Sequence, residues 1–461
     1  MKFFFTLGFL TNKLNLLEKN LGAVLTGSVV FKLFSLVLSF VVTIVLGRTI
    51  GPDGLGVYSF CLAFVGIASI PARLGIPTVV MREISRYRVT QNFSLMRGII
   101  RFSHMTVIGF TIIVLSVLLV LENFQNTILD SMYEDTLETA ALLVIILPLI
   151  ALRTGMLQGL NKVVISTIPE SLIKPMFFIL IVTVYFYMFG YTSATPVMMM
   201  RVEVGASLFS LVVGYYMYRY YKPSELDKVH PSYEIRKWLK SVVPFMFMGG
   251  IMIFNQSADV ILLGYLSTAN EVGFYKVGYG LSALMLIFYG LVGGILSPRF
   301  SVFAEQKNIK LISSYNKTFT KLVVLLTIPV FALLYIFGAN IINTLYGAQF
   351  VSANNVMQPL IFAYSIMLVF GFSQIILNMS DNQKYTTICY VVAAAINIIM
   401  NILLIPQYGS FGASVATATS YLVLTISTWV LSIRIMSINS SLIPNYFLRV
   451  FIKNRCTQGH D

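Results

Sequence analysis

The chain has 461 residues, of which 57% are hydrophobic and only 11% are charged. A soluble protein of this length carries about 25% charged residues, so the composition excludes an ordinary soluble globular protein. The formal net charge of +14 would suit a nucleic-acid partner, but the positive charges are spread between apolar stretches, and we predict no nucleic-acid partner.

The apolar stretches are each about as long as the roughly 20 residues that a helix needs to cross a bilayer. They predict an all-α polytopic membrane protein. In chain order, twelve transmembrane helices are expected at 22–46, 56–81, 99–121, 139–159, 165–189, 194–218, 241–264, 277–298, 319–338, 356–379, 385–405 and 411–436.

The basic residues predict the orientation of these helices. Most of the 32 Lys and Arg residues fall in alternate gaps, which the preference of short basic loops for the cytoplasm places inside the cell. The opposite gaps contain only Arg48 and Lys276, and one of them, at 122–138, is acidic. Both termini are therefore predicted to be cytoplasmic.

The spans and the charges together predict a division into two bundles of six helices. The start, MKFFFTLGFL, is similar to a secretory signal, but no small-residue cleavage site follows it, and we interpret it as an arm. The predicted parts are a cytoplasmic or interfacial arm at 1–21, an N-terminal bundle at 22–218, a cytoplasmic linker at 219–240, a C-terminal bundle at 241–436 and a cytoplasmic tail at 437–461.

An internal echo favours a duplication. Short matching segments recur with an offset of 217 residues: Leu46-Gly47 and Leu263-Gly264, Gly56-Val57-Tyr58 and Gly273-Phe274-Tyr275, and Arg82 and Arg299. With six spans in each half, both copies have the same orientation, which is the parallel-repeat arrangement of some transporters.

We take seven ionisable residues of the apolar spans as the main functional candidates. A charge near the centre of a bilayer costs at least about 2.5–3.5 kcal/mol, so such residues normally face a cavity or a partner. They are Lys32, Arg73, Glu170, Lys174, Arg201, Glu203 and Asp259.

The cations among them predict a path for an anion. Lys32, Arg73 and Lys174 fall in the inner half of the membrane, whereas Arg201 and Arg48 lie in its outer half or at its mouth. Together they form a possible ladder for a negatively charged headgroup. The alternative is that the long side chains snorkel to the interface or pack structurally.

The carboxylates are candidates for binding a coupling ion. Glu170 and Lys174 are four residues apart and are predicted to pair on one helix face, whether for structure or for function. Asp259 either binds a coupling cation or proton, or hydrogen-bonds neighbouring backbone or Asn255. Glu203 is the third candidate for the coupling ion.

The sequence contains no pattern for covalent chemistry or for a resident metal. The three cysteines, Cys61, Cys389 and Cys456, are scattered, and the three histidines lack metal-ligand spacing. The motifs G-x-x-x-x-G-K-[ST], H-E-x-x-H and G-x-S-x-G are all missing from the sequence. We therefore predict no catalytic residue, no metal site and no cofactor.

Several segments resemble one family of membrane transporters, the Wzx-like lipid-linked oligosaccharide flippases, or polysaccharide biosynthesis transporters, of the multidrug/oligosaccharidyl-lipid/polysaccharide exporter superfamily. The similar segments, in the order that the family shows, are VLGRTIGPDGLGVYSF at 45–60, RLGIPTVVMREISR at 73–86, NQSADVILLG at 255–264, VGFYKVGYG at 272–280, LSPRF at 296–300 and NILLIPQYGSFGASVATATSY at 401–421. Arg48 and Asp53 stand within the first of them.

This resemblance implies a V-shaped, MATE-like fold that works by alternating access in the bacterial inner membrane. The implied substrate is an undecaprenyl-pyrophosphate-linked oligosaccharide repeat unit of O-antigen or capsule type, which moves from the cytoplasmic to the periplasmic leaflet. Coupling to a Na+ or H+ gradient is expected. A polysaccharide polymerase and a chain-length regulator are the implied protein partners, beside the membrane lipids.

Three other functions remain open from the sequence. A MATE-type drug or metabolite antiporter has the same fold, but cationic drugs favour a cavity dominated by carboxylates. A membrane-embedded glycan polymerase or ligase usually needs a larger outer loop than this chain offers. A scaffold without transport activity is the third, since fold does not determine function.

Overall fold

The computed structural model describes residues 2–73, 75–125, 131–190 and 194–444, and within these ranges every regular element is a helix. The first part of the chain forms α1 (Lys2–Ala68), α2 (Ile70–Arg73), α3 (Ile76–Val89), α4 (Phe93–Gln125), α5 (Ser131–Gly159), α6 (Val163–Ile168), a π-helix (Pro169–Ile173), α7 (Lys174–Phe189) and α8 (Pro196–Tyr221). The all-helical fold predicted from the sequence is thus confirmed.

The second part begins after a short 3-10 helix at Ser224–Asp227. It comprises α9 (Ile235–Leu266), α10 (Ala269–Ser282), α11 (Ile287–Glu305), α12 (Ile309–Tyr346), α13 (Ala353–Val369), α14 (Ser373–Met379) and α15 (Gln383–Met436). Because α9 starts at Ile235, the helical part of this half begins inside the segment predicted as a linker.

Two long helices are each interrupted by a glycine that follows or precedes a proline. Gly51 (φ 67°, ψ −175°) breaks α1 just before Pro52, and Gly409 (φ 55°, ψ −133°) breaks α15 shortly after Pro406. Glycine adopts positive φ without a Cβ clash, and proline removes a backbone donor. Each of the two helices therefore contains two segments that meet at an angle.

These breaks bear on the number of membrane spans. In the described residues, eight helices are long and apolar enough to cross a membrane, or nine if α13 and α14, which are bent by 53°, form one span. The two segments of α1 count once in this number, as do those of α15. The twelve crossings and the cytoplasmic termini stay predictions.

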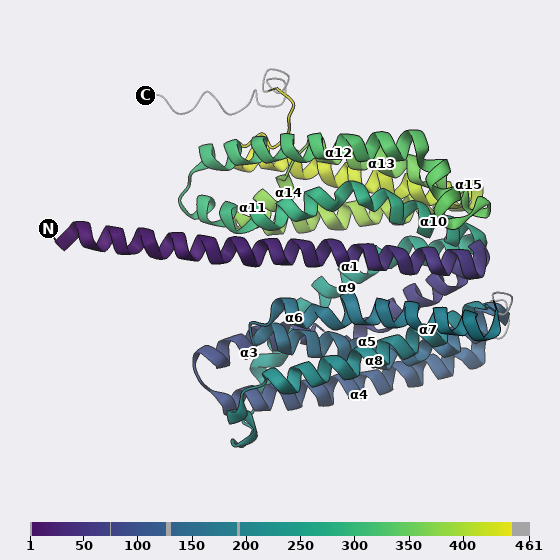
Figure 1. The fold of residues 1–461 in the computed structure, drawn as a ribbon, viewed down its shortest axis with the longest axis horizontal. Coiled ribbons are helices and arrows are strands. Elements are labelled where there is room, and N and C mark those ends of the chain that lie inside the picture. Colours follow the sequence, from purple (N-terminus) through teal and green to yellow (C-terminus); the bar gives the residue numbers. More distant parts are fainter. Residues whose placement is uncertain (1, 74, 126–130, 191–193, 445–461) are drawn as a thin grey trace.

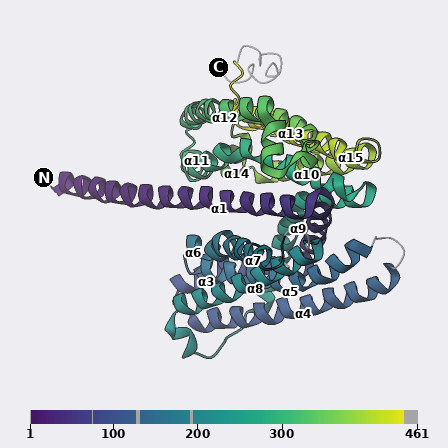
Figure 2. The same ribbon diagram turned by 45° about the vertical axis from the view of Figure 1, so that its right-hand side comes forward.

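The helices form two groups with two helices between them. Figure 1 shows α3 to α8 on one side and α10 to α15 on the other, with α1 and α9 between the groups, and Figure 2 shows the same separation from another direction. Among the contacts between these groups, α1 packs most extensively against α10. The contact between the halves is therefore concentrated on α1 and α10.

Four turns repeat the same backbone motif in both parts of the chain. In each, a non-glycine residue with positive φ follows a helix, and the next N–H bonds the carbonyl five residues back, as in a Schellman motif. The left-handed residues are Gln91, Asn161, Lys307 and Asp381, and the bonds are Asn92 to Tyr87, Lys162 to Leu157, Asn308 to Phe303 and Asn382 to Leu377. The repetition agrees with the predicted duplication.

Candidate functional site

The two halves meet where the echoed sequence segments contact each other. A methyl group on Gly56 of α1 would overlap the carbonyl oxygen of Ala269, and one on Gly273 of α10 would overlap that of Pro52. The residues of the two contacts correspond by the same offset of 217, so one contact repeats the other with the halves exchanged. We call this pair of contacts the outer seam, because the charge pattern assigns it to the outside.

Two side-chain contacts reinforce this end of the molecule. Glu271 of α10 accepts hydrogen bonds from the backbone N–H of Ser410 (2.7 Å) and from its hydroxyl, at the break in α15. Arg48 of α1 donates to the carbonyl oxygens of Leu345 (2.7 Å) and Thr344 at the end of α12. Arg48, predicted as a ligand of the substrate, thus caps a helix with its guanidinium.

A first cavity, of about 220 Å³, lies inward of the seam between α1, α7, α8 and α10. Four charged side chains line it: Glu170, Lys174, Glu203 and Lys276. Its other walls carry hydroxyls and apolar groups, among them Tyr58, which lies beside Glu203. The structure therefore brings three of the predicted candidates together, and it adds a lysine that the prediction left out.

The predicted pair of Glu170 and Lys174 is wrong, because each has another partner. Lys174 forms an ion pair with Glu203 on α8, and Glu170 forms one with Arg153 on α5. The cause is the π-helix, in which the N–H of Lys174 bonds the carbonyl of Pro169, five residues back. The wider turn removes the side-by-side placement that residues four apart have in an α-helix.

Arg153 is a functional candidate that sequence reasoning missed. It lies within the predicted span at 139–159 and is not among the seven predicted candidates, yet its side chain is 0% exposed, and its Nη1 donates to the carbonyl of Ser166 at 3.1 Å. The available signal was Glu170, a carboxylate deep in an apolar span that needed a cation from a neighbouring helix.

A second cavity, of about 140 Å³, lies in the other half around Asp259. This carboxylate is 7% exposed and accepts hydrogen bonds from the Tyr275 hydroxyl (2.7 Å), the Thr417 hydroxyl (2.9 Å) and the Asn401 amide (2.6 Å). The donors come from α10 and from both segments of α15. The other predicted neighbour, Asn255, lies outside the described side chains.

The echoed tyrosines each lie next to a carboxylate. Tyr58 lies beside Glu203 in the first cavity, and Tyr275, 217 residues later, donates to Asp259 in the second. The two carboxylates do not share this offset, so they are not equivalent positions of the repeat. The position after the tyrosine is Ser59 in one copy and Lys276 in the other, so the second copy alone adds a lysine there.

Lys276 lies in the wall of both cavities. Among the residues that the structure describes, no ion pair includes it. We predicted it to lie in an outer gap, one residue before the span at 277–298, but α10 begins at Ala269 and carries it inside. The signal for this earlier start was Thr268, directly before α10, because threonine favours the N-cap position of helices.

The remaining predicted cations lie elsewhere. Lys32 on α1 and Arg201 on α8 are exposed, and Arg73 on α2 is half-buried with an Nε that has no hydrogen-bond partner among the described residues. None of the three lines either of the two cavities. Lys174 is the predicted cation that the structure places in a cavity together with Lys276.

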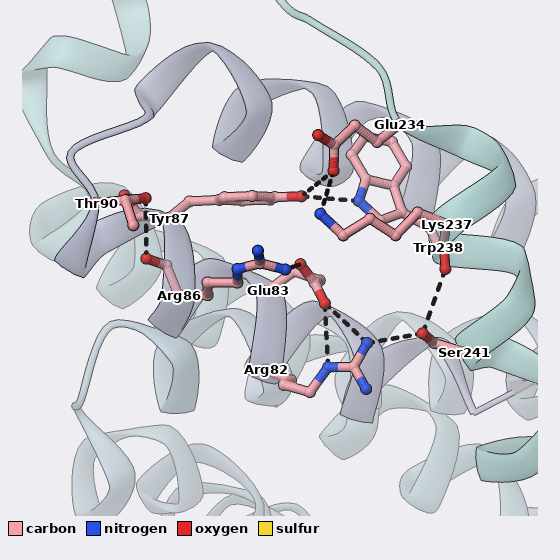
Figure 3. A network of polar contacts seen from close by, with 9 residues as sticks. All are labelled: Arg82, Glu83, Arg86, Tyr87, Thr90, Glu234, Lys237, Trp238 and Ser241. Carbon is pink, nitrogen blue, oxygen red and sulfur yellow. Dashed lines mark hydrogen bonds and ion pairs between the residues drawn. The ribbon is translucent and has the colours of Figure 1, made fainter.

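At the opposite end, a polar network fixes the start of α9 to α3. Trp238 donates its indole N–H to the Tyr87 hydroxyl (3.0 Å), which donates to Glu234 (3.3 Å), and Lys237 completes the contact with Glu234 at 2.5 Å (Figure 3). Burial raises the pKa of Tyr87 to about 12, so the phenol stays protonated near neutral pH and keeps this donor.

Beside it, a second group of charges reaches across to α9. Arg82 forms an ion pair with the buried Glu83 (2.8 Å) and donates to the Ser241 hydroxyl at 2.7 Å (Figure 3). Arg86 lies 3.9 Å from the same carboxylate. The start of α9 is thus held by the first group of helices, whereas its other end, at Asp259, contacts the second.

The arrangement as a whole is that of a transporter of the MATE fold. The structure superposes on an inward-facing multidrug resistance MATE family transporter of the MOP superfamily with a TM-score of 0.70, covering 87% of this chain and 94% of that one at 13% identity. At this identity the likeness shows the fold.

The family is shown by the sequence comparison. Residues 23–304 match the model of the polysaccharide biosynthesis protein family, and the chain belongs to that family, as its resemblance predicted. It is 24% identical over 385 residues to the probable low-salt glycan biosynthesis flippase Agl15 of Haloferax volcanii (82% of this chain, 76% of that one). It is 23% identical over 391 residues to a putative O-antigen transporter of Shigella flexneri (80% and 88%).

The outer seam predicts a conformational effect of adding one methyl group. Gly56→Ala or Gly273→Ala forces the two backbones apart and opens the outer end, because each new Cβ meets a carbonyl oxygen. A Ser59→Cys reporter in a chain otherwise free of cysteine should then react faster with a membrane-impermeant maleimide added outside. Gly280→Ala, where nothing lies within 4 Å of the new methyl, is the control on the same helix. Equal labelling in all variants contradicts a closed seam.

The ion pair of Lys174 and Glu203 predicts that replacing one partner destabilises the protein more than replacing both. Glu203→Gln leaves the lysine without its partner and should destabilise the protein by about 3 kcal/mol, since breaking a buried pair costs more than replacing both members. The apparent melting temperature in detergent should recover in Lys174→Met/Glu203→Gln. The exposed Glu138→Gln is the control. A double variant less stable than Glu203→Gln argues against the pair.

Proposed function

We propose that this protein is a flippase for a lipid-linked oligosaccharide repeat unit, of O-antigen or capsule type and linked to undecaprenyl pyrophosphate. It moves the unit from the cytoplasmic to the periplasmic leaflet of a bacterial inner membrane. The observation that carries the proposal is Lys276, a cation without an ionic partner in the described residues, in the wall shared by the two cavities. Family membership and the flippase and transporter relatives support it.

The charge balance of the cavities favours an anionic substrate. Lys174 is neutralised by Glu203 and Arg153 by Glu170, so these pairs offer little net charge to a ligand. Lys276 has no carboxylate partner among the described residues, and in a low-dielectric site the attraction between a lysine cation and a diphosphate is much stronger than in water. The same lysine opposes a cationic drug, which weakens the alternative of a drug antiporter.

Alternating access gives each structural element a part in transport. A headgroup that enters from the cytoplasmic side meets Lys276 while the outer seam is closed, and the polyprenyl chain stays in the surrounding lipid. Separation of α1 from α10 at Gly56 and Gly273 then exposes the headgroup outward. A polymerase and its chain-length regulator would consume the product there, which keeps the direction of transport.

Asp259 is the best of the three candidates for the coupling ion. Glu170 and Glu203 are both held in ion pairs, whereas Asp259 forms no ion pair in the described residues and bonds neutral groups whose oxygens are ligands for a small cation. Asn397 and Thr417 line the same cavity and add an amide and a hydroxyl oxygen. A Na+ ion or a proton at Asp259 would replace hydrogen bonds that now join α9 and α10 to α15.

The role proposed for Lys276 predicts a loss of polysaccharide export when this side chain is removed. In a strain that lacks this gene, Lys276→Ala should reduce surface polysaccharide at least about tenfold, because one charge-assisted hydrogen bond contributes about 1.5–3 kcal/mol. Lys276→Arg should retain most of it. The exposed Lys310→Ala is the control, and protein levels are compared by immunoblot. Normal surface polysaccharide in Lys276→Ala would rule out the proposed role of this residue.

The role proposed for Asp259 predicts that its replacement abolishes the response of flipping to an ion gradient and leaves the protein folded. In proteoliposomes that contain a fluorescent lipid-linked oligosaccharide, an imposed Na+ or H+ gradient should accelerate flipping by the native protein and not by Asp259→Asn. The exposed Glu305→Gln should respond like the native protein. A gradient response that survives Asp259→Asn removes this residue from the coupling step.

A further inference from the structure

The second cavity has the chemistry of a carbohydrate site, and we infer that it holds the sugar ring adjacent to the pyrophosphate. This inference rests on the proposed function, because it concerns the glycan of the same headgroup. It divides the headgroup between the two halves, with the diphosphate at Lys276 and the first sugar beside Asp259.

Tyrosines form one side of this cavity. Tyr275 and Tyr279 of α10 line it with their rings stacked at 5.8 Å between centroids, and Tyr390 and Tyr421 line it from the two segments of α15. The ring of Tyr421 is supported from behind by Tyr364, whose ring lies edge-on at 5.1 Å. The aromatic wall is thus held in place by packing from three helices.

Short polar side chains line the same cavity. Asp259, Asn397, Thr417 and Ser420 offer a carboxylate, an amide and two hydroxyls. These are groups that hydrogen-bond the hydroxyls of a sugar.

This combination suits a pyranose better than the other parts of the substrate. The C–H face of a sugar ring stacks on an aromatic face, while its hydroxyls bond carboxylate and amide groups. A polyprenyl chain would leave the polar side chains of the cavity without hydrogen-bond partners, which is unfavourable. A diphosphate would be repelled by Asp259, and Lys276 is the one cation in the lining.

The position of Lys276 sets the orientation of the headgroup. The lysine borders both cavities, so a phosphate bound to it lies at the entrance of the second one. The sugar that is bonded to this phosphate then reaches the tyrosines. When the Tyr275 and Thr417 hydroxyls exchange Asp259 for sugar hydroxyls, the bonds of α9 to α10 and to the second segment of α15 change, which links sugar recognition to the contacts between helices.

The test compares two ligands that differ by one sugar. The probes are a short-chain polyprenyl pyrophosphate that bears one N-acetylhexosamine and the same polyprenyl pyrophosphate without a sugar. Binding to the full chain in nanodiscs is measured for the native protein, for Tyr279→Leu and for Tyr421→Leu. Tyr335→Leu, at a ring that is 51% exposed on α12, is the matched control.

The expected result is a loss of affinity for the glycosylated probe alone. Tyr279→Leu and Tyr421→Leu should weaken binding of the glycosylated probe about tenfold and change binding of the bare probe less than twofold. Tyr279→Phe keeps the aromatic face and should retain most of the affinity, which separates stacking from misfolding.

Other outcomes overturn one proposal or the other. Equal weakening of both probes, or of neither, contradicts a sugar site at these tyrosines, as does a native protein that binds both probes equally well. A native protein that binds neither probe instead contradicts the proposed function itself. Lys276→Ala should weaken both probes, so the two proposals have separate readouts.

Discussion

The close approach of α1 and α10 is the constraint on which the rest of the structure depends. At Gly56 and Gly273 each backbone lies against a carbonyl oxygen of the other segment, and no larger residue fits there. Because the contact brings together two copies of one motif, it also fixes the positions of Tyr58 and Tyr275, which follow the two glycines. Tyr58 and Tyr275 thereby lie near the junction of the halves, each on a carboxylate of its own cavity.

The proposed function depends on the difference between the two copies. A tyrosine beside a carboxylate in each cavity would give two polar cavities, neither suited to a diphosphate. The exchange of Ser59 for Lys276 at the equivalent position puts one positive charge at the boundary. The ion pairs of Arg153 and Lys174 leave that charge without competition, because buried charges that are paired interact weakly with a newly arriving ion.

Motion between the halves has to respect two fixed points. The network of Tyr87, Glu234 and Trp238 holds the start of α9 to α3, while Asp259 near its other end bonds α10 and α15. One helix is therefore attached to both groups. A change in the bonds of Asp259, whether by an ion or by a sugar, alters the second attachment and leaves the first intact, which is the asymmetry that a rocking movement requires.

The sequence by itself determined the class of fold, the family and most of the ionisable candidates, because hydropathy, short motifs and charges in apolar spans are local properties of the chain. Only the tertiary structure decided their partners. The π-helix at Pro169–Ile173 rotates Lys174 away from Glu170, and α10 begins early enough to carry Lys276 inward. Arg153 is buried because Glu170, from another helix, neutralises it. Such pairings depend on the register and packing of helices that are distant in sequence, which no local pattern specifies.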